Sequence, residues 1–316
     1  MKYVFRLLGL LVAMLLGAFV YVYFAFSEPD RALEELTERW AKPPSQFLTI
    51  SGMKVHVRDE GPKDDPLPII LVHGTSASLH TWDGWTEVLS QHHRVIRFDM
   101  QGFGLTGPHP DAKYRIEDYA ETLVNLMDAL QIDSAIVAGN SLGGYVAWSA
   151  AVLYPARVAK LVLVDSSGIP FESQSVPIAF RIYSSPLLKS LFGHIMPRSL
   201  VQSSIENVYG NPDKISGDLV DRYFELTTRE GNREALAKRF LDTKAGQLAN
   251  RLGELTQPTL ILWGEQDRLI PVSVGQRFHQ EITHSQFISF SELGHVPHEE
   301  NPQITAAAVE QFLHKE

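Results

Sequence analysis

The serine at position 141 stands in a sequence setting that could make it a nucleophile. It lies within Gly139-Asn-Ser-Leu-Gly143, which matches the G-x-S-x-G pattern of a tight turn that exposes a serine hydroxyl. The pattern arises by chance in some chains, but here it stands between a strand-like run at 134–138 and a helical pattern from Leu142. Because such a turn must join a strand to a helix, this placement predicts that Ser141 is a nucleophile.

A serine hydroxyl needs a base to take its proton, and the base needs a carboxylate to orient it. Asp267 comes just after an apolar run at 259–263, and His295 comes after another strand-like run at 286–290. The carboxyl ends of parallel strands meet at one edge of a sheet, so both side chains are expected beside Ser141. We therefore predict a catalytic triad of Ser141, Asp267 and His295.

Three other residues are weaker candidates for the same roles. Glu265 and Asp165 also follow strand-like runs and are alternative acids, while His298 is an alternative base at the start of the last helical pattern. The order serine, acid, histidine along the chain agrees with each of these choices, so the geometry must decide among them.

Acyl transfer also needs two backbone N–H groups that point at the developing oxyanion. One is expected from Leu142, the residue after the nucleophile, and the other from the loop after the apolar run at 69–72. In that loop Thr75 is the candidate donor and Ser76 is its alternative. His73 is expected to hold the loop in place through a side-chain hydrogen bond.

Two further patterns suggest dinucleotide binding and metal binding, but the neighbouring residues argue against both. Residues 102–107 read G-x-G-x-x-G, but Pro108 and Pro110 follow where a dinucleotide site needs a helix N-terminus. His92 and His93 are adjacent and point apart on most backbones, H-E-x-x-H is absent, and the chain has no cysteine. We therefore expect neither a metal nor a cofactor.

The chain from residue 46 alternates short apolar runs with helical patterns, which predicts a mostly parallel sheet with helices on both faces. Strands are expected at 47–50, 54–58, 69–72, 94–98, 134–138, 160–164, 259–263 and 286–290, and helices at 116–130, 142–153 and 304–313. Residues 167–247 contain helical patterns alone and predict a cap over the catalytic edge of the sheet. The cap helices are expected near 185–195, 198–208, 217–229 and 232–243.

Residues 1–26 form an apolar N-terminal segment that is predicted to be a transmembrane anchor. The run at 7–26 carries no charge and would be about 30 Å long as a helix, the thickness of a bilayer core. Lys2 and Arg6 lie on its short side, so the positive-inside rule places the catalytic domain on the non-cytoplasmic, periplasmic side. The alternatives are a buried core helix and a signal peptide cleaved at the small-x-small site 25–27, which would give a secreted protein.

The composition is that of a globular protein, and the length is enough for one large domain or two small ones. The chain has 316 residues, of which 44% are hydrophobic and 21% charged. Its formal net charge is -9 and it has no long basic run, which disfavours a nucleic-acid partner because phosphate contacts need clustered Lys and Arg. We expect the catalytic domain at 46–316 and a stalk at 27–45, where Lys42-Pro-Pro breaks a short helical pattern.

These motifs, in this order, resemble those of the α/β-hydrolase superfamily over residues 46–316. The resemblance rests on His73-Gly74, Asp99-Met-Gln-Gly102-Phe-Gly104, Gly139-Asn-Ser-Leu-Gly-Gly144, the loop from Gly264 to Asp267 and Gly294-His295. It implies the α/β-hydrolase fold, with a mostly parallel central sheet, flanking helices and a helical cap insertion. The elbow around Ser141 is similar to that of meta-cleavage-product C–C hydrolases and of some bacterial lipases and esterases.

Two differences separate the chain from the C–C hydrolases. Those enzymes usually carry H-G-x-G-P-G where this chain has His73-Gly-Thr-Ser-Ala-Ser78, and a Trp after the catalytic histidine where it has Val296. The resemblance therefore favours a serine esterase or lipase that cleaves apolar carboxylic esters through an acyl-enzyme. Cleavage of a C–C bond, a lactone or an amide by the same triad is the alternative. The expected partners are a small-molecule ester or lipid and, through residues 1–26, the membrane.

Overall fold

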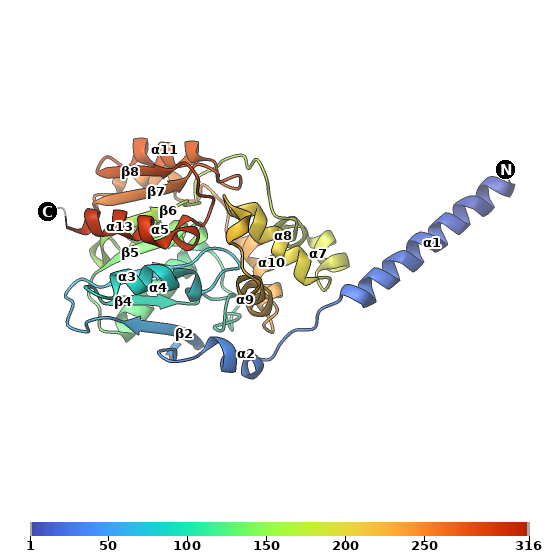
Figure 1. Cartoon of the computed structure of the whole chain (residues 1–316), viewed down its shortest axis with the longest axis horizontal. Helices are drawn as coiled ribbons and strands as arrows, with labels where there is room; N and C mark the ends of the chain where they lie inside the picture. The colour runs from blue at the N-terminus through green and yellow to red at the C-terminus, as the bar shows by residue number, and fades with distance from the viewer. Residues whose placement is uncertain (1, 315–316) are drawn as a thin grey trace.

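The protein is built on an eight-stranded sheet, seen here in a computed structural model that describes residues 2–314 (Figure 1). The strand order is β1-β2-β4-β3-β5-β6-β7-β8, and all pairs from β4 to β8 are parallel, whereas β1–β2 and β2–β4 are antiparallel. The strands are β1 Gln46–Ile50, β2 Met53–Glu60, β3 Ile69–Val72, β4 Val95–Phe98, β5 Ala135–Asn140, β6 Val158–Val164, β7 Thr259–Gly264 and β8 Ser285–Phe290. The predicted α/β-hydrolase fold is therefore confirmed.

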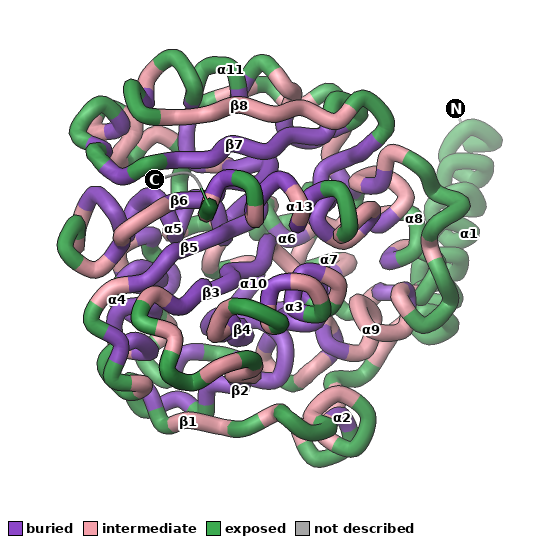
Figure 2. The backbone as a smooth tube through the Cα atoms, turned by 60° about the vertical axis from the view of Figure 1, so that its left-hand side comes forward, coloured by how far each residue is buried: buried purple, intermediate pink, exposed green. Residues whose placement is uncertain are grey.

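Helices cover both faces of the sheet because side chains of a strand point alternately to either side. On β3, Ile70 and Val72 pack into the core shared with α4 (Ile116–Ala129), α5 (Leu142–Leu153) and α11 (Val272–Glu281). Ile69 and Leu71 pack on the opposite face, against α3 (Asp83–Leu89) and α13 (Pro302–Leu313). The central strands are buried on both faces (Figure 2), which is why they are wholly apolar in the sequence.

Helices α3 and α11, together with the first helix of the cap, are absent from the sequence prediction. Both α3 and that cap helix, α6 (Ile178–Ser184), have seven residues, about two turns, which is too short to display a helical period. The last predicted helix is preceded by a separate turn of helix, α12 (Pro297–Glu300), on which His298 lies.

The cap lies between β6 and β7, and its five α-helices all fall inside residues 167–247. After α6 it comprises α7 (Pro186–Phe192), α8 (Arg198–Val208), α9 (Gly217–Thr227) and α10 (Asn232–Asp242). Two of these helices begin at serines that cap them, since Ser185 accepts a hydrogen bond from Leu188 N and Ser216 accepts one from Leu219 N. Figure 1 shows the cap between the sheet and the N-terminal helix.

The N-terminal helix α1 (Lys2–Phe26) extends away from the domain and has no buried residue, so the alternative of a buried core helix is wrong. Its mean hydropathy is 2.4, and by length and composition it could cross a membrane or be a signal sequence. The following residues, expected to form a stalk, lie against the domain. In α2 (Leu33–Trp40), Leu36 packs with Leu105 and Leu226, and Trp40 Nε1 donates a 2.6 Å hydrogen bond to Glu225.

Candidate active site

Ser141 occupies a strained position between the end of β5 and the start of α5. Its φ is 55° and its ψ is −116°, a conformation that costs free energy in a residue with a side chain. The surrounding backbone holds it there, because Ser141 N donates to Val164 O and Ser141 O accepts from Ser167 N, both at 3.0 Å. The turn thus lifts the serine side chain out of the strand and toward the cap.

The two glycines of the motif are required by close backbone contacts. A Cβ atom on Gly139 would lie 2.1 Å from the carbonyl oxygen of Gly143, and one on Gly143 would lie 2.0 Å from the oxygen of Val72. Neither contact can be relieved by rotating a side chain, since both involve backbone atoms. The G-x-S-x-G spacing therefore follows from how tightly β5 turns into α5 beside β3.

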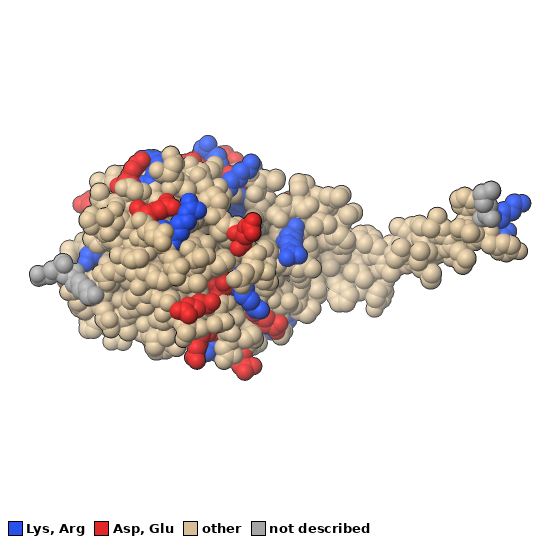
Figure 3. Space-filling view, turned by 90° about the horizontal axis from the view of Figure 1, so that it is seen from above, with Lys and Arg blue, Asp and Glu red and all other residues tan. Residues whose placement is uncertain are grey.

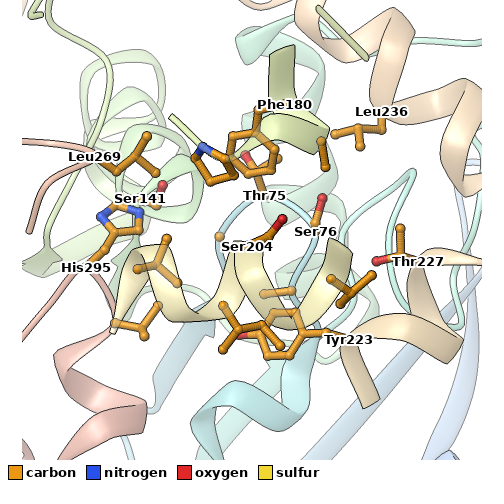
Figure 4. Close-up of a pocket in the computed structure, with 18 of the residues that line it drawn as sticks. Thr75, Ser76, Ser141, Phe180, Ser204, Tyr223, Thr227, Leu236, Leu269 and His295 are labelled. Atoms are coloured by element: carbon orange, nitrogen blue, oxygen red, sulfur yellow. The ribbon is translucent and has the colours of Figure 1, made fainter. Parts of the chain in front are cut away.

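His295 and Asp267 form a buried pair next to this turn. His295 Nδ1 lies 2.7 Å from Asp267 Oδ2, and both side chains are at most 5% exposed. The other carboxylate oxygen of Asp267 accepts hydrogen bonds from the amides of Leu269 (2.8 Å) and Ile270 (2.9 Å), which fix its orientation. With Nδ1 bound to the carboxylate, Nε2 is the free ring nitrogen, and Figure 4 shows the His295 ring beside Ser141.

The alternatives Glu265 and His298 lie in other surroundings. Glu265 is exposed and accepts a 2.6 Å hydrogen bond from Ser289 Oγ. His298 is buried, with Nε2 3.1 Å from Thr81 Oγ1 and its ring 4.0 Å from that of Trp82, centroid to centroid. Burial lowers the pKa of His298 well below its ordinary value. Both residues thus have local structural partners of their own.

Asp165, the other alternative acid, is part of the buried cluster. It follows β6, and a carboxylate oxygen of Asp165, one of Asp267 and a ring nitrogen of His295 all lie within 4.8 Å of one another. Asp165 Oδ1 accepts a 3.0 Å hydrogen bond from Gly264 N. Burial raises the pKa of Asp165 well above that of an ordinary carboxyl, and the charge of Asp267 raises it further. Asp165 therefore stays protonated to a higher pH than an exposed aspartate.

The candidate oxyanion donors come from two segments of the chain, the start of α5 and the loop after β3. Leu142 is the first residue of α5, where an amide has no acceptor within the helix and the helix dipole is positive. Thr75 and Ser76 line the cavity at Ser141, in the loop after β3 (Figure 4). That loop is tied down by His73, whose Nδ1 lies 2.7 Å from Gly74 O.

The opposite ring nitrogen of His73 accepts a 3.0 Å hydrogen bond from Met100 N, so Nδ1 carries the proton and donates to Gly74 O. Burial lowers the pKa of His73, which keeps the ring neutral and in this tautomer. The expectation that His73 holds the loop by a side-chain hydrogen bond is confirmed.

Asn140 and Glu300 are positioning residues that the sequence does not reveal. Asn140 Nδ2 donates to His295 O (2.9 Å) and to Val164 O (3.1 Å), which joins the serine turn to the histidine loop. Glu300 is buried and accepts hydrogen bonds from the amides of Gly294 and Gly210, both at 2.9 Å. Asn140 and His295 are 155 residues apart in the chain, so no local pattern could indicate that they meet.

The glycine-rich loop at 102–107 folds around Asp99. The Asp99 carboxylate accepts hydrogen bonds from Leu79 N (2.7 Å) and Leu105 N (2.8 Å) and lies 2.8 Å from His56 Nδ1. Burial opposes ionisation of Asp99, but His56 holds the pKa of that carboxyl well below its usual range. A Cβ on Gly104 would lie 2.2 Å from this carboxylate, so Gly104 makes room for a carboxylate within the chain, and no helix follows the loop until α4.

A largely apolar cavity opens in front of Ser141 and His295 (Figure 4). It contains about 790 Å³ of empty space, the open solvent at its mouth included. The cap supplies most of its walls: Pro177, Ala179, Phe180, Tyr183, Met196, Leu200, Val201, Ser204, Ile205, Val208, Tyr223, Thr227 and Leu236. Within the described part of the chain, no Lys or Arg lines this cavity.

The fold and this site define a class of protein that sequence comparison also identifies. Residues 68–302 match the family model described as "alpha/beta hydrolase fold". The chain therefore belongs to the α/β-hydrolase family, and it is a hydrolase by that membership.

Individual relatives differ in their named activities. The chain is 31% identical over 263 residues to 2-hydroxy-6-oxo-2,4-heptadienoate hydrolase of Pseudomonas putida, which covers 79% of this chain and 89% of that protein. A thermophilic esterase from Thermogutta terrifontis is 25% identical with a TM-score of 0.71, over 86% of this chain and 98% of that one. A membrane phospholipase A is similar in fold, at 23% identity and a TM-score of 0.73, over 99% of this chain and 98% of that one.

Proposed function

We propose that the protein is a serine hydrolase that cleaves carboxylic esters with apolar acyl groups. Ser141 Oγ attacks the ester carbonyl while His295 Nε2 takes the hydroxyl proton, and His295 then returns that proton to the leaving alcohol. The amides of Leu142 and Thr75 bind the oxyanion, and Asp267 orients His295 and stabilises its charged form. Water, deprotonated by His295, then attacks the acyl-enzyme and releases the carboxylic acid.

The observation that carries the ester proposal is the composition of the cavity wall. Its polar groups are uncharged hydroxyls and amides together with the His295 ring, and its remaining surface is aliphatic and aromatic. An apolar acyl chain gains free energy by leaving water for such a wall. A carboxylate would lose its hydration there without a cationic partner, since neither Lys nor Arg is among the described lining residues.

A second candidate, hydrolysis of a C–C bond, is favoured by the 31% identity to the dienoate hydrolase of Pseudomonas putida. The substrate in that protein's name is a carboxylate. Its negative charge would need hydrogen-bond donors in place of a cation in this cavity. Ser204, Tyr223 and Thr227 of the cap supply hydroxyls there, so this candidate is tested alongside esters.

A comparison of kcat/KM among candidate substrates tests the proposal. The full chain in mild detergent is assayed with p-nitrophenyl acetate, butyrate, octanoate and palmitate, and with 2-hydroxy-6-oxo-2,4-heptadienoate. We expect the highest kcat/KM on a medium-chain ester and a far lower value on the dienoate. Faster turnover of the dienoate than of every ester would replace the ester proposal with C–C hydrolysis.

We also propose that α1 is a membrane anchor and that the catalytic domain lies on the non-cytoplasmic side. The charge-free run at 7–26 and the basic residues before it support this arrangement. The mass of the mature protein from membranes tests it: an intact N-terminal segment supports the anchor, whereas a new N-terminus near residue 27 would show cleavage. Protease added to intact spheroplasts should digest the domain if it lies outside.

A further inference from the structure

Helix α7 of the cap presents an apolar surface to solvent, formed by Leu187, Leu188 and Leu191. These side chains are 69%, 37% and 43% exposed. Leu191 is four residues after Leu187 and three after Leu188, so it adjoins both on one side of the helix. Apart from α1, only three other large hydrophobic side chains in the described chain are comparably exposed, namely Ile178, Leu241 and Ile304. We refer to the three leucines as the α7 surface.

The α7 surface is fixed relative to α1 by contacts at the base of that helix. Glu28 N donates to His194 O (2.9 Å), and Met196 N donates to Phe26 O (3.2 Å). Further up α1, the ring of Phe19 meets the ring of Phe192 edge to face, with centroids 5.9 Å apart. The end of α7 therefore lies beside α1, above the point where α1 joins the domain (Figure 1).

This contact sets the depth of α7 in a membrane that α1 spans. The charge-free run ends at Phe26, so the bilayer core is expected to reach about that residue. Phe19 lies seven residues earlier, which corresponds to roughly 10 Å along the helix axis. Because Phe192 packs at the level of Phe19, the end of α7 lies within that depth. Interfacial helices insert their apolar faces by about 5–10 Å.

We infer that the α7 surface is embedded in the part of the lipid bilayer nearest the catalytic domain. It thus adds a second membrane contact to the anchoring by α1. This inference rests on the membrane-anchor part of the proposed function. Lys189, the charged residue of α7, is ion-paired with Glu234 of α10, so its charge is partly neutralised within the cap. In Figure 3 the surface of the domain next to the base of α1 shows no charged side chain on the face in view.

When α7 contacts lipid, a single helix, α6, lies between α7 and the catalytic cavity. The neighbouring helix α6 lines the cavity with Phe180 and Tyr183, and Met196, just beyond α7, lines it too. Tyr183 Oη donates a 2.7 Å hydrogen bond to Gly193 O, so the cavity wall and the end of α7 are joined. The cap wall of the catalytic cavity would thus lie next to the lipid.

Single cysteines report this position directly, because the natural chain contains none. Leu187→Cys, Leu16→Cys in α1 and Ile304→Cys in α13 are each labelled with the fluorophore NBD in the full chain. The proteins are reconstituted in vesicles of phosphatidylethanolamine and phosphatidylglycerol that carry nitroxide lipids. Ile304 is the matched control, since it is an exposed apolar residue on a helix of the opposite part of the domain.

We expect the label at 187 to be quenched at least about twofold more strongly than the label at 304. Nitroxide near the headgroup should quench the label at 187 best, and nitroxide deep in the chains should quench the label at 16 best. Quenching at 16 with none at 187 would overturn the inference while leaving the anchor intact. A label at 187 that is shielded from water but not quenched would indicate a protein partner and would also overturn it. Absence of quenching at 16 would overturn the anchor and the inference together.

Discussion

Asn140, the residue before the candidate nucleophile, donates a 2.9 Å hydrogen bond from Nδ2 to the backbone oxygen of His295. The same amide group donates to Val164 O at 3.1 Å. One buried side chain thus connects β5, β6 and the loop that carries the candidate base. The relative position of Ser141 and His295 depends on this connection as well as on the two loops themselves.

Replacement of Asn140 by alanine is expected to lower kcat by about ten- to a hundredfold, because a small displacement of the base weakens proton transfer. Two buried carbonyl oxygens would lose a donor, at a cost of about 1–3 kcal/mol of unfolding free energy. Ester turnover and urea unfolding measure the two effects. Asn125→Ala is the control, since Asn125 bonds only to Ser51 Oγ at the exposed surface. Equal kcat values in the two variants would contradict the positioning role.

The glycine pattern of the elbow makes a prediction about stability. Gly139→Ala should prevent accumulation of folded protein or lower the melting temperature strongly, since the added methyl would overlap the Gly143 carbonyl at 2.1 Å. Gly253→Ala is the matched control, because a Cβ there meets no atom within 4 Å. Thermal unfolding of both variants by circular dichroism compares them. A Gly139→Ala protein as stable as Gly253→Ala would show that the turn is looser than a 2.1 Å approach to the Gly143 carbonyl implies.

The two neighbouring aspartates should respond differently to the same substitution. Asp267→Asn removes the charge that pairs with His295 and is expected to lower kcat by about three to four orders of magnitude. Asp165→Asn should lower kcat far less, because Asp165 bonds to Gly264 N and its raised pKa disfavours the charged form that asparagine would replace. Pre-steady-state and steady-state ester hydrolysis compare the two. A greater loss in Asp165→Asn would make Asp165 the acid of the triad.

The raised pKa of Asp165 also predicts a pH dependence of stability. The native state binds this proton more tightly than the unfolded chain, in which an aspartate has a pKa of about 4. Its contribution is fully present below about pH 4 and is lost as the pH rises toward the raised native value. Asp165→Asn should therefore gain stability relative to the natural protein as the pH rises from 4. Urea unfolding at several pH values tests this, and a constant difference would contradict the raised pKa.

The sequence predicts the fold well where a motif and a strand lie side by side in the chain. The run at 69–72 is β3 to the residue, and the helix from Leu142 to Leu153 is α5. Burial on both faces of the sheet makes such strands apolar throughout, which a single sequence reveals. The order of motifs along the chain likewise placed Asp267 and His295 at the ends of β7 and β8.

The sequence could not reveal contacts between distant segments. Asn140 and Glu300 form hydrogen bonds with backbone groups, which every residue type carries. The identities of their partner residues therefore do not indicate a positioning role for Asn140 or Glu300. The sequence does not reveal the docking of residues 27–45 for a similar reason. Its partners, among them Glu225 and Leu226, lie in the cap, and a short amphipathic helix such as α2 is compatible with either a free stalk or a packed one.

The proposed hydrolysis requires above all that Ser141 is an activated nucleophile. A fluorophosphonate probe, which reacts with the activated serine of serine hydrolases, is applied to the full chain in membranes, and the labelled peptide is mapped by mass spectrometry. We predict one modified residue, Ser141, with loss of labelling in Ser141→Ala and strong slowing in Asp267→Asn. Labelling of a different residue, or undiminished labelling of Ser141→Ala, would contradict the proposed site.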